Sequence, residues 1–126
     1  MIHGNARVRE IKKQQREAIM YRLLSTLWTQ AQVDNPDFAN LYINRVDLST
    51  DGSVVRVLFY SPQGQEFFTQ KLDQLKLIKP SMRKALAVEL QKRYTPDLFF
   101  VYDEKFAKQQ RVEELLHQIS TEQSDD

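Results

Sequence analysis

The sequence contains no cysteine, and this removes several kinds of site before any pattern is considered. Without a thiol, the 126-residue chain can form neither disulfide bonds nor thiolate metal sites, and such a composition fits the cytosol. The chain also lacks an apolar run near the roughly 18–20 residues that cross a bilayer. Its first residues lack the apolar core of a signal peptide. We therefore expect a cytoplasmic protein without a membrane partner.

Glycine and histidine are also scarce, and their scarcity limits the chemistry that the chain can support. Gly4, Gly52 and Gly64 are too far apart to form a phosphate-binding loop, and His3 and His117 stand alone. The acids near predicted turns and strand ends are typical of turn-forming or capping side chains: Asp47, Asp51, Asp97, Asp103 and Glu104. We therefore predict a protein that is not an enzyme and that uses no cofactor, metal ion or small-molecule substrate.

Charge is unevenly distributed along a chain whose net charge is only +1. Residues 1–22 carry six cations against two acids, a net charge of +4, and residues 76–93 carry six against one, a net charge of +5. Residues 103–126 carry seven acids against three bases, a net charge of −4. Basic segments beside an acidic end favour a polyanionic partner, although solvated helix faces explain the same pattern.

The first half of the chain predicts a helix, a loop and a β-hairpin. We expect the helix over residues 6–29, a loop that tolerates shortening over residues 30–40, and strands over residues 41–48 and 54–60. The strands flank an Asp51-Gly52 turn and should pair antiparallel. The residues predicted to share a face are Val8, Ile11, Ala18, Ile19, Leu23 and Leu27 in the helix, Tyr42, Val46 and Leu48 in the first strand, and Val55, Val57 and Phe59 in the second.

Pro80 interrupts a long helical pattern that begins at Gln65. Because proline removes one helical hydrogen bond and clashes with the preceding turn, we expect a kink or break near residues 77–79. A second helix should then end before Pro96 and lead into a strand over residues 98–102. The expected apolar stripe comprises Phe68, Leu72, Leu75 and Ile78 before the kink and Met82, Leu86 and Leu90 after it.

Beyond Asp103 the pattern predicts a weak helix and a flexible acidic tail at about residues 118–126. The apolar side chains of this helix are expected to dock on the body of the protein: Phe106, Val112, Leu115 and Leu116.

Residues 93–103, Arg-Tyr-Thr-Pro-Asp-Leu-Phe-Phe-Val-Tyr-Asp, resemble the signature of the ribosome-binding factor A family. The similarity extends to residues 46–51 and 111–116, so it covers about residues 8–116. It implies an α+β fold with a single type II KH-like domain over residues 1–126, in which helices cover one face of a three-stranded sheet. The family carries an Ala-x-Gly kink between its two helices, where this chain has Ile78-Lys79-Pro80. That departure changes how closely the backbone can approach a phosphate.

The resemblance also implies a ribosome assembly factor that binds the immature small ribosomal subunit and its rRNA and assists rRNA processing and late maturation. We expect it to act as a monomer. Cations beside a helix N-terminus at Pro80 are the first candidates for phosphate contacts, and those of the first helix are the second. The predicted RNA-binding residues are Lys76, Lys79, Arg83 and Lys84 near the kink, and Arg7, Arg9, Lys12, Lys13 and Arg16 in the first helix. A KH-type protein that binds RNA outside the ribosome and a protein–protein adaptor remain as alternatives.

Overall fold

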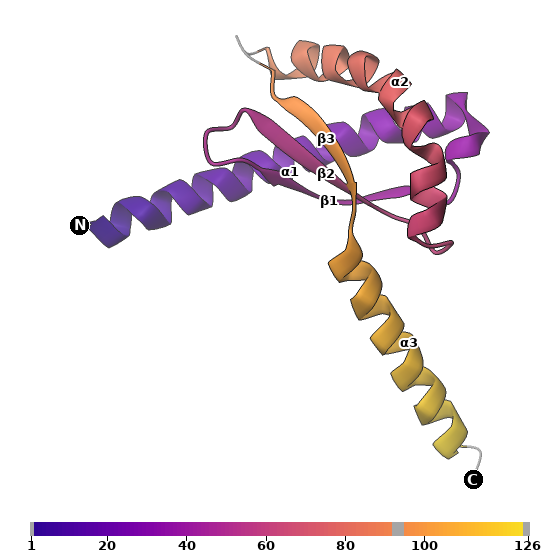
Figure 1. Ribbon diagram of the computed structural model, residues 1–126. Coiled ribbons are helices and arrows are strands. Elements are labelled where there is room, and N and C mark those ends of the chain that lie inside the picture. The colour runs from indigo at the N-terminus through magenta and orange to yellow at the C-terminus, as the bar shows by residue number, and fades with distance from the viewer. Residues whose placement is uncertain (1, 92–94, 125–126) are drawn as a thin grey trace.

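The computed structural model describes residues 2–91 and 95–124, which form three α-helices and a three-stranded sheet (Figure 1). The predicted order of helices and strands is confirmed, except that one helix stands where two were expected on either side of Pro80. In chain order the elements are α1 (Ile2–Asp34), a 3₁₀ turn (Pro36–Phe38), β1 (Tyr42–Leu48), β2 (Val54–Tyr60), α2 (Gln65–Leu90), β3 (Asp97–Tyr102) and α3 (Glu104–Ser124).

The sheet has the order β1-β2-β3, with β1 antiparallel and β3 parallel to β2. The hairpin between β1 and β2 turns where the sequence predicts, because Gly52 adopts a φ of 75° that favours glycine. On β2 the side chains of Val55, Val57 and Phe59 are fully buried, as expected. The ring of Phe59 contacts Trp28 of α1 and Phe68 of α2, with centroids 5.1 and 5.7 Å apart. Both helices therefore cover the same face of the sheet.

The register of β1 differs from the predicted alternation. The pairing with β2 shifts between Ile43 and Arg45, which leaves Asn44 as an extra residue in a β-bulge. Ile43 consequently turns to the core face with Leu48, and Tyr42 is exposed to solvent. The prediction that Tyr42 shares a face with Leu48 is wrong, because the inserted residue reverses the alternation.

The helix α1 is longer than predicted and packs through a different stripe. Its buried side chains are Met20, Leu24 and Trp28, one position beyond the predicted row of Ile19, Leu23 and Leu27. Val8 and Ile11 are exposed because the first turns of α1 extend past the sheet (Figure 1).

The loop predicted over residues 30–40 is largely ordered, and its contacts argue against the prediction that it tolerates shortening. Residues 30–34 complete α1, and Phe38 in the following 3₁₀ turn is 1% exposed. The amide of Gln32 donates to the carbonyl oxygens of Phe38 and Leu41, and the indole N–H of Trp28 donates to the oxygen of Leu41 at 2.8 Å. This connection is therefore fixed to the core by an aromatic side chain and by hydrogen bonds.

A single helix, α2, replaces the two helices expected on either side of Pro80. It continues through Pro80, and its axis bends between its two ends (Figure 1). Phe68, Leu75, Met82 and Leu86 are buried along its inner side, whereas Leu90 is only half-buried. The helix ends at Leu90, several residues before the predicted end at Pro96, because Gln91 takes a left-handed conformation and its N–H bonds to the oxygen of Ala87.

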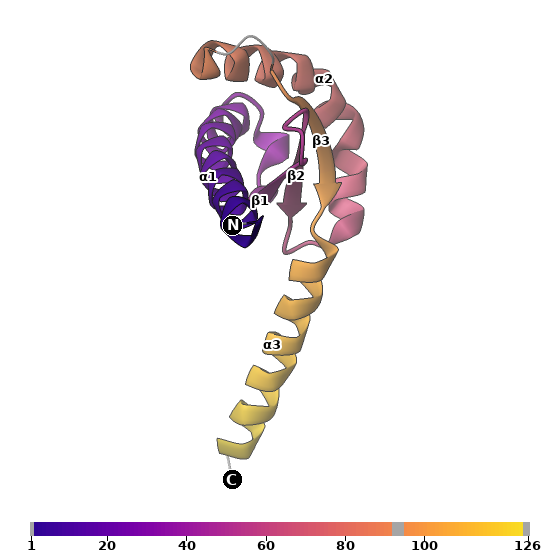
Figure 2. The same ribbon diagram turned by 90° about the vertical axis from the view of Figure 1, so that its left-hand side faces the viewer.

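The last helix, α3, projects away from the rest of the molecule (Figures 1 and 2). Phe106 packs edge-on against Tyr60 with centroids 4.8 Å apart, but Val112, Leu115 and Leu116 are exposed. The expected docking of those three side chains is wrong. The helix also continues to Ser124, through most of the segment predicted as an acidic tail.

Candidate nucleic-acid interface

The four predicted cations of α2 separate into two pairs with different surroundings. Lys76 and Lys84 are exposed, whereas Lys79 and Arg83 turn toward the chain that leads into β3. The Lys79 ammonium lies 3.6 Å from the carboxylate of Asp97, the first residue of β3.

Arg83 fastens α2 to the start of β3. Its Nε donates to the oxygen of Pro96 at 3.2 Å, and its Nη2 donates to the oxygen of Thr95 at 3.1 Å. A guanidinium carries five N–H donors, so Arg83 keeps donors for a phosphate while holding this strand entry. Its substitution should therefore cost folding free energy as well as affinity, which makes Lys76 and Lys84 the cleaner positions for testing RNA contact.

The predicted cations of α1 lie along its first half. Arg7, Arg9, Lys12 and Arg16 are exposed, and Lys13 is half-buried with its ammonium 3.9 Å from the carboxylate of Asp47 on β1. This half of α1 uses its exposed surface for charge, because helix packing against the core begins only at Met20.

The two cationic groups reach different strands of the sheet. Lys13 lies over β1 and Lys79 lies over the start of β3, and these strands form opposite edges of the sheet. The C-terminal part of α2 nevertheless crosses α1 (Figure 2), where Arg16 and Arg22 of α1 and Glu89 of α2 line a hollow of about 370 Å³. Residues 92 and 93, which continue the basic run of α2 in the sequence, lie outside the described residues.

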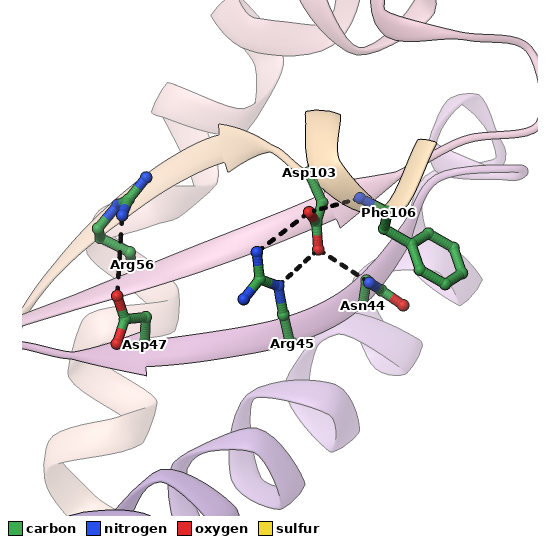
Figure 3. Close-up of polar contacts among 6 residues, drawn as sticks. All are labelled: Asn44, Arg45, Asp47, Arg56, Asp103 and Phe106. Carbon is green, nitrogen blue, oxygen red and sulfur yellow. Dashed lines mark hydrogen bonds and ion pairs between the residues drawn. The ribbon is translucent and has the colours of Figure 1, made fainter. Parts of the chain in front are cut away.

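A polar cluster that the sequence did not reveal connects β1 to the start of α3. The Asp103 cluster comprises Asn44, Arg45, Asp103 and the backbone N–H of Phe106 (Figure 3). The Asp103 carboxylate accepts from Arg45 Nε at 2.7 Å, from Arg45 Nη2 at 3.2 Å, from Asn44 Nδ2 at 2.9 Å and from Phe106 N at 3.1 Å. Asp103 thus caps α3, a role expected for an acid at this place in the sequence.

The electrostatics of the cluster keep Asp103 ionised although it is buried. Burial raises the pKa of this carboxyl, but the hydrogen bonds from Arg45, Asn44 and Phe106 together outweigh it, so the pKa lies below its usual value. The hydrogen bond to Asp103 in turn raises the pKa of Arg45. Beside the cluster, Asp47 lies 3.7 Å from Arg56 (Figure 3). These acids bind neighbouring cations or cap a helix, an arrangement that favours structure over proton transfer.

Within residues 2–91 and 95–124, no three His, Cys, Asp or Glu side chains converge in a way that could hold a metal ion. No helix in this part of the chain is long and apolar enough to span a membrane. The candidate interface is a set of surface cations on two helices, an arrangement that suits contacts with phosphates.

Comparisons with known proteins agree with this arrangement. The sequence model described as ribosome-binding factor A matches residues 12–116. The chain belongs to the ribosome-binding factor A family. The ribosome-binding factor A of Syntrophomonas wolfei is 34% identical over 115 residues, which cover 88% of this chain and 93% of that relative.

Solved structures of the family share the fold. The crystal structure of ribosome-binding factor A from Thermus thermophilus has a TM-score of 0.60 to this chain at 30% identity, covering 71% of this chain and 94% of the other. A homology model of the Thermus thermophilus protein, fitted into a cryo-EM map of a 30S–RbfA complex, has a TM-score of 0.50 at 26% identity and covers 68% of this chain and 89% of the other. The α+β fold and the predicted family are confirmed.

The extent of the family match divides the predicted site residues. The matched segment includes every predicted cation of α2 and those of α1 from Lys12 onward, but Arg7 and Arg9 precede it. It ends at Leu116, so the last turns of α3 also lie beyond it. The cations of α2 are therefore part of the domain that this chain shares with ribosome-binding factor A proteins.

Proposed function

We propose that this protein is a ribosome assembly factor that binds the immature small ribosomal subunit. Membership of the ribosome-binding factor A family over residues 12–116 carries the proposal. The related Thermus thermophilus protein, which was fitted into a map of a 30S–RbfA complex, supports the choice of the small subunit. On the subunit the protein assists rRNA processing and late maturation in the cytoplasm, acts as a monomer and catalyses no reaction.

Contact with rRNA is made through phosphates. Lys76 and Lys84 reach solvent from α2, and Arg83 and Lys79 supply further positive charge beside the start of β3. Because the cations lie on helix surfaces and not in a pocket with converging polar groups, recognition follows the shape and charge of the RNA backbone. The Ile78-Lys79-Pro80 segment contributes by bending α2, which changes the direction of the side chains that follow it.

Sedimentation through a sucrose gradient tests the proposal. The protein should migrate with free small subunits and with their precursors, and should be absent from translating ribosomes. Comigration with the small subunits that persists at low salt and is lost at high salt would fit binding through phosphates. A protein found only in RNA–protein particles lighter than the subunit would instead be an RNA-binding protein that acts outside the ribosome. Partner binding that survives complete RNase digestion would identify an adaptor.

A further inference from the structure

The first half of α1 carries three cations in a row on one side. Arg9, Lys12 and Arg16 are three and four residues apart, a spacing that makes them neighbours on a helix surface. All three are exposed, and the first turns of α1 extend past the sheet (Figure 1). Among the described residues, no acid forms an ion pair with any of the three. The row therefore presents positive charge to solvent that no ion pair offsets.

The acids of this half of α1 lie on another side of the helix. Glu10 and Glu17 each follow a cation of the row by one residue, which is about 100° around an α-helix. Glu17 accepts a hydrogen bond from the backbone N–H of Leu48 at 2.9 Å, so the side that carries the acids faces β1. Positive and negative charge are thus separated around α1.

The row leads into the hollow of about 370 Å³ between α1 and the C-terminal part of α2 (Figure 2). Arg16 lines this hollow, and so do Ile19 and Leu23, which continue the row at the same spacing. Arg22, which was not among the predicted RNA-binding residues, lines the hollow as well and is exposed. Among the described residues that line it, these two arginines stand against one acid, Glu89.

The row disfavours the helix that carries it, because like charges three or four residues apart repel each other. Residues 6–12 are all exposed, so packing against the core does not compensate for this repulsion. A short helical segment without such packing is marginal in water. A ligand with closely spaced negative charges would remove the repulsion and stabilise the first turns of α1.

We propose that one strand of rRNA lies along this row and enters the hollow, where Arg9, Lys12, Arg16 and Arg22 bind its phosphates. The inference rests on the proposed function, which supplies rRNA as the polyanion, and it adds a path along α1 to the cations of α2. An acidic protein fits the row less well. Protein–protein interfaces are depleted in lysine and depend on buried aromatic or aliphatic anchors, which the three cations of the row do not provide.

Two of the predicted cations of α1 lie outside this path. Arg7 is nine residues from Arg16, which places it on the opposite side of the helix. Lys13 is half-buried, and its ammonium lies 3.9 Å from the carboxylate of Asp47 on β1. The path therefore takes three of the five predicted α1 cations and gains Arg22.

A pair of double variants tests the row. Lys12→Gln/Arg16→Gln removes two of its charges, and Lys108→Gln/Arg111→Gln removes the same two charges from exposed positions of α3, which points away from the body (Figure 1). Because each phosphate contact releases about 0.7–0.9 counterions, the slope of log affinity for small subunits against log salt should be smaller by about 1.5 in the α1 variant. Its affinity should meet that of the wild type near 1 M salt and be about 30-fold lower at about 0.1 M salt.

The controls separate contact from net charge. Lys108→Gln/Arg111→Gln should change the affinity by less than about 3-fold, and Lys12→Arg/Arg16→Lys, which conserves both charges, should restore most of the wild-type affinity. The substituted side chains of α1 are exposed and have no ion pair among the described residues, so thermal stability should not fall. An equal loss of affinity in both glutamine variants would show an effect of net charge alone and would overturn the inference.

Photo-crosslinking identifies what enters the hollow. A benzophenone amino acid at position 19, where the side chain is 44% exposed and lines the hollow, should form its main product with rRNA. A main product with a subunit protein, or no product, would overturn the inference. Wild-type affinity and slope in the Lys12→Gln/Arg16→Gln variant would refute this inference alone, whereas wild-type protein that fails to bind subunits would refute the proposed function as well.

Discussion

Replacing Asp103 with alanine should destabilise the protein more than its position at the end of a strand suggests. The substitution removes the acceptor for four hydrogen bonds, two from Arg45 and one each from Asn44 and the N–H of Phe106. It also removes the cap of α3, which leaves the first turn of that helix without its side-chain acceptor.

The magnitude follows from the burial of the two partners. Asp103 is 1% exposed, but the Arg45 side chain is 51% exposed, so water can replace much of what the guanidinium loses. The cost therefore falls below the roughly 3–5 kcal/mol typical of a fully buried broken pair, and with the lost cap we expect about 2–4 kcal/mol. Asp103→Asn retains an acceptor for the cap but loses the charge, and should cost about 1–2 kcal/mol.

Urea unfolding followed by circular dichroism gives the free energy of unfolding for each variant. Asp97→Ala is the matched control, because its exposed carboxylate pairs with Lys79 at 3.6 Å and accepts from the N–H of Leu98 at 3.0 Å, so its loss should cost less than about 1 kcal/mol. A double-mutant cycle with Arg45→Ala measures the coupling directly. An Asp103→Ala cost below about 0.5 kcal/mol, or a coupling near zero, would refute the role assigned to the Asp103 cluster.

Three further outcomes are expected. Leu86→Ala should lower the free energy of unfolding by about 2–5 kcal/mol and Leu90→Ala by clearly less, because Leu86 is fully buried and Leu90 is not. Equal losses in urea unfolding would contradict this packing of α2. Phe38→Ala should cost about 3–5 kcal/mol in the same assay, and a near-neutral result would show that the connection after α1 is dispensable. Acid should weaken the fold: the pKa of Asp51 falls from 3.8 to about 2, mainly through the hydroxyl of Ser53, and that of Asp103 is also lowered. Because the folded state binds protons at these two carboxylates less readily than the unfolded state does, the ionised carboxylates stabilise the fold above about pH 4, and this stabilisation is lost as the pH falls. The midpoint of thermal unfolding should therefore decrease from about pH 4 to about pH 2, and Asp103→Asn should make this decrease shallower.

The hairpin and the central strand could be predicted because their signals are local. The Asp51-Gly52 turn and the alternation of Val55, Val57 and Phe59 each lie within a few residues. The bulge at Asn44 could not be predicted, since an inserted polar residue leaves the sequence pattern unchanged and shows only in the pairing with β2. One extra residue was enough to reverse the faces of Tyr42 and Ile43.

The helices show the limits of periodicity in a different way. The apolar residues of α1 include Val8 and Ile11, which extend beyond the sheet, and a stripe fitted through them was displaced by one residue from the buried row that contains Leu24. The pattern of α3 shows an apolar side but does not indicate what this side contacts, so it could not predict whether the helix docks on the body of the protein. Periodicity identifies a face, and only the arrangement of the whole chain assigns its partner.

The candidate site was predictable in its residue types but not in its contacts. A basic run in α2 was evident, yet nothing in the sequence indicated that Arg83 binds the carbonyl oxygens of Thr95 and Pro96. Arg45 and Asp103 are 58 positions apart, and their pairing depends on the bulge and on the sheet order together. These contacts are long-range, so no local motif records them.

The most direct test of the account is the salt dependence of binding to purified small ribosomal subunits. We predict that Lys76→Ala/Lys84→Ala binds more weakly and has a slope of log affinity against log salt that is smaller by about one to two, with unchanged thermal stability. The control Lys71→Ala/Lys105→Ala removes the same charge outside the predicted interface and should keep the wild-type slope. Wild-type affinity and slope in the Lys76→Ala/Lys84→Ala variant would contradict the claim that α2 binds rRNA phosphates.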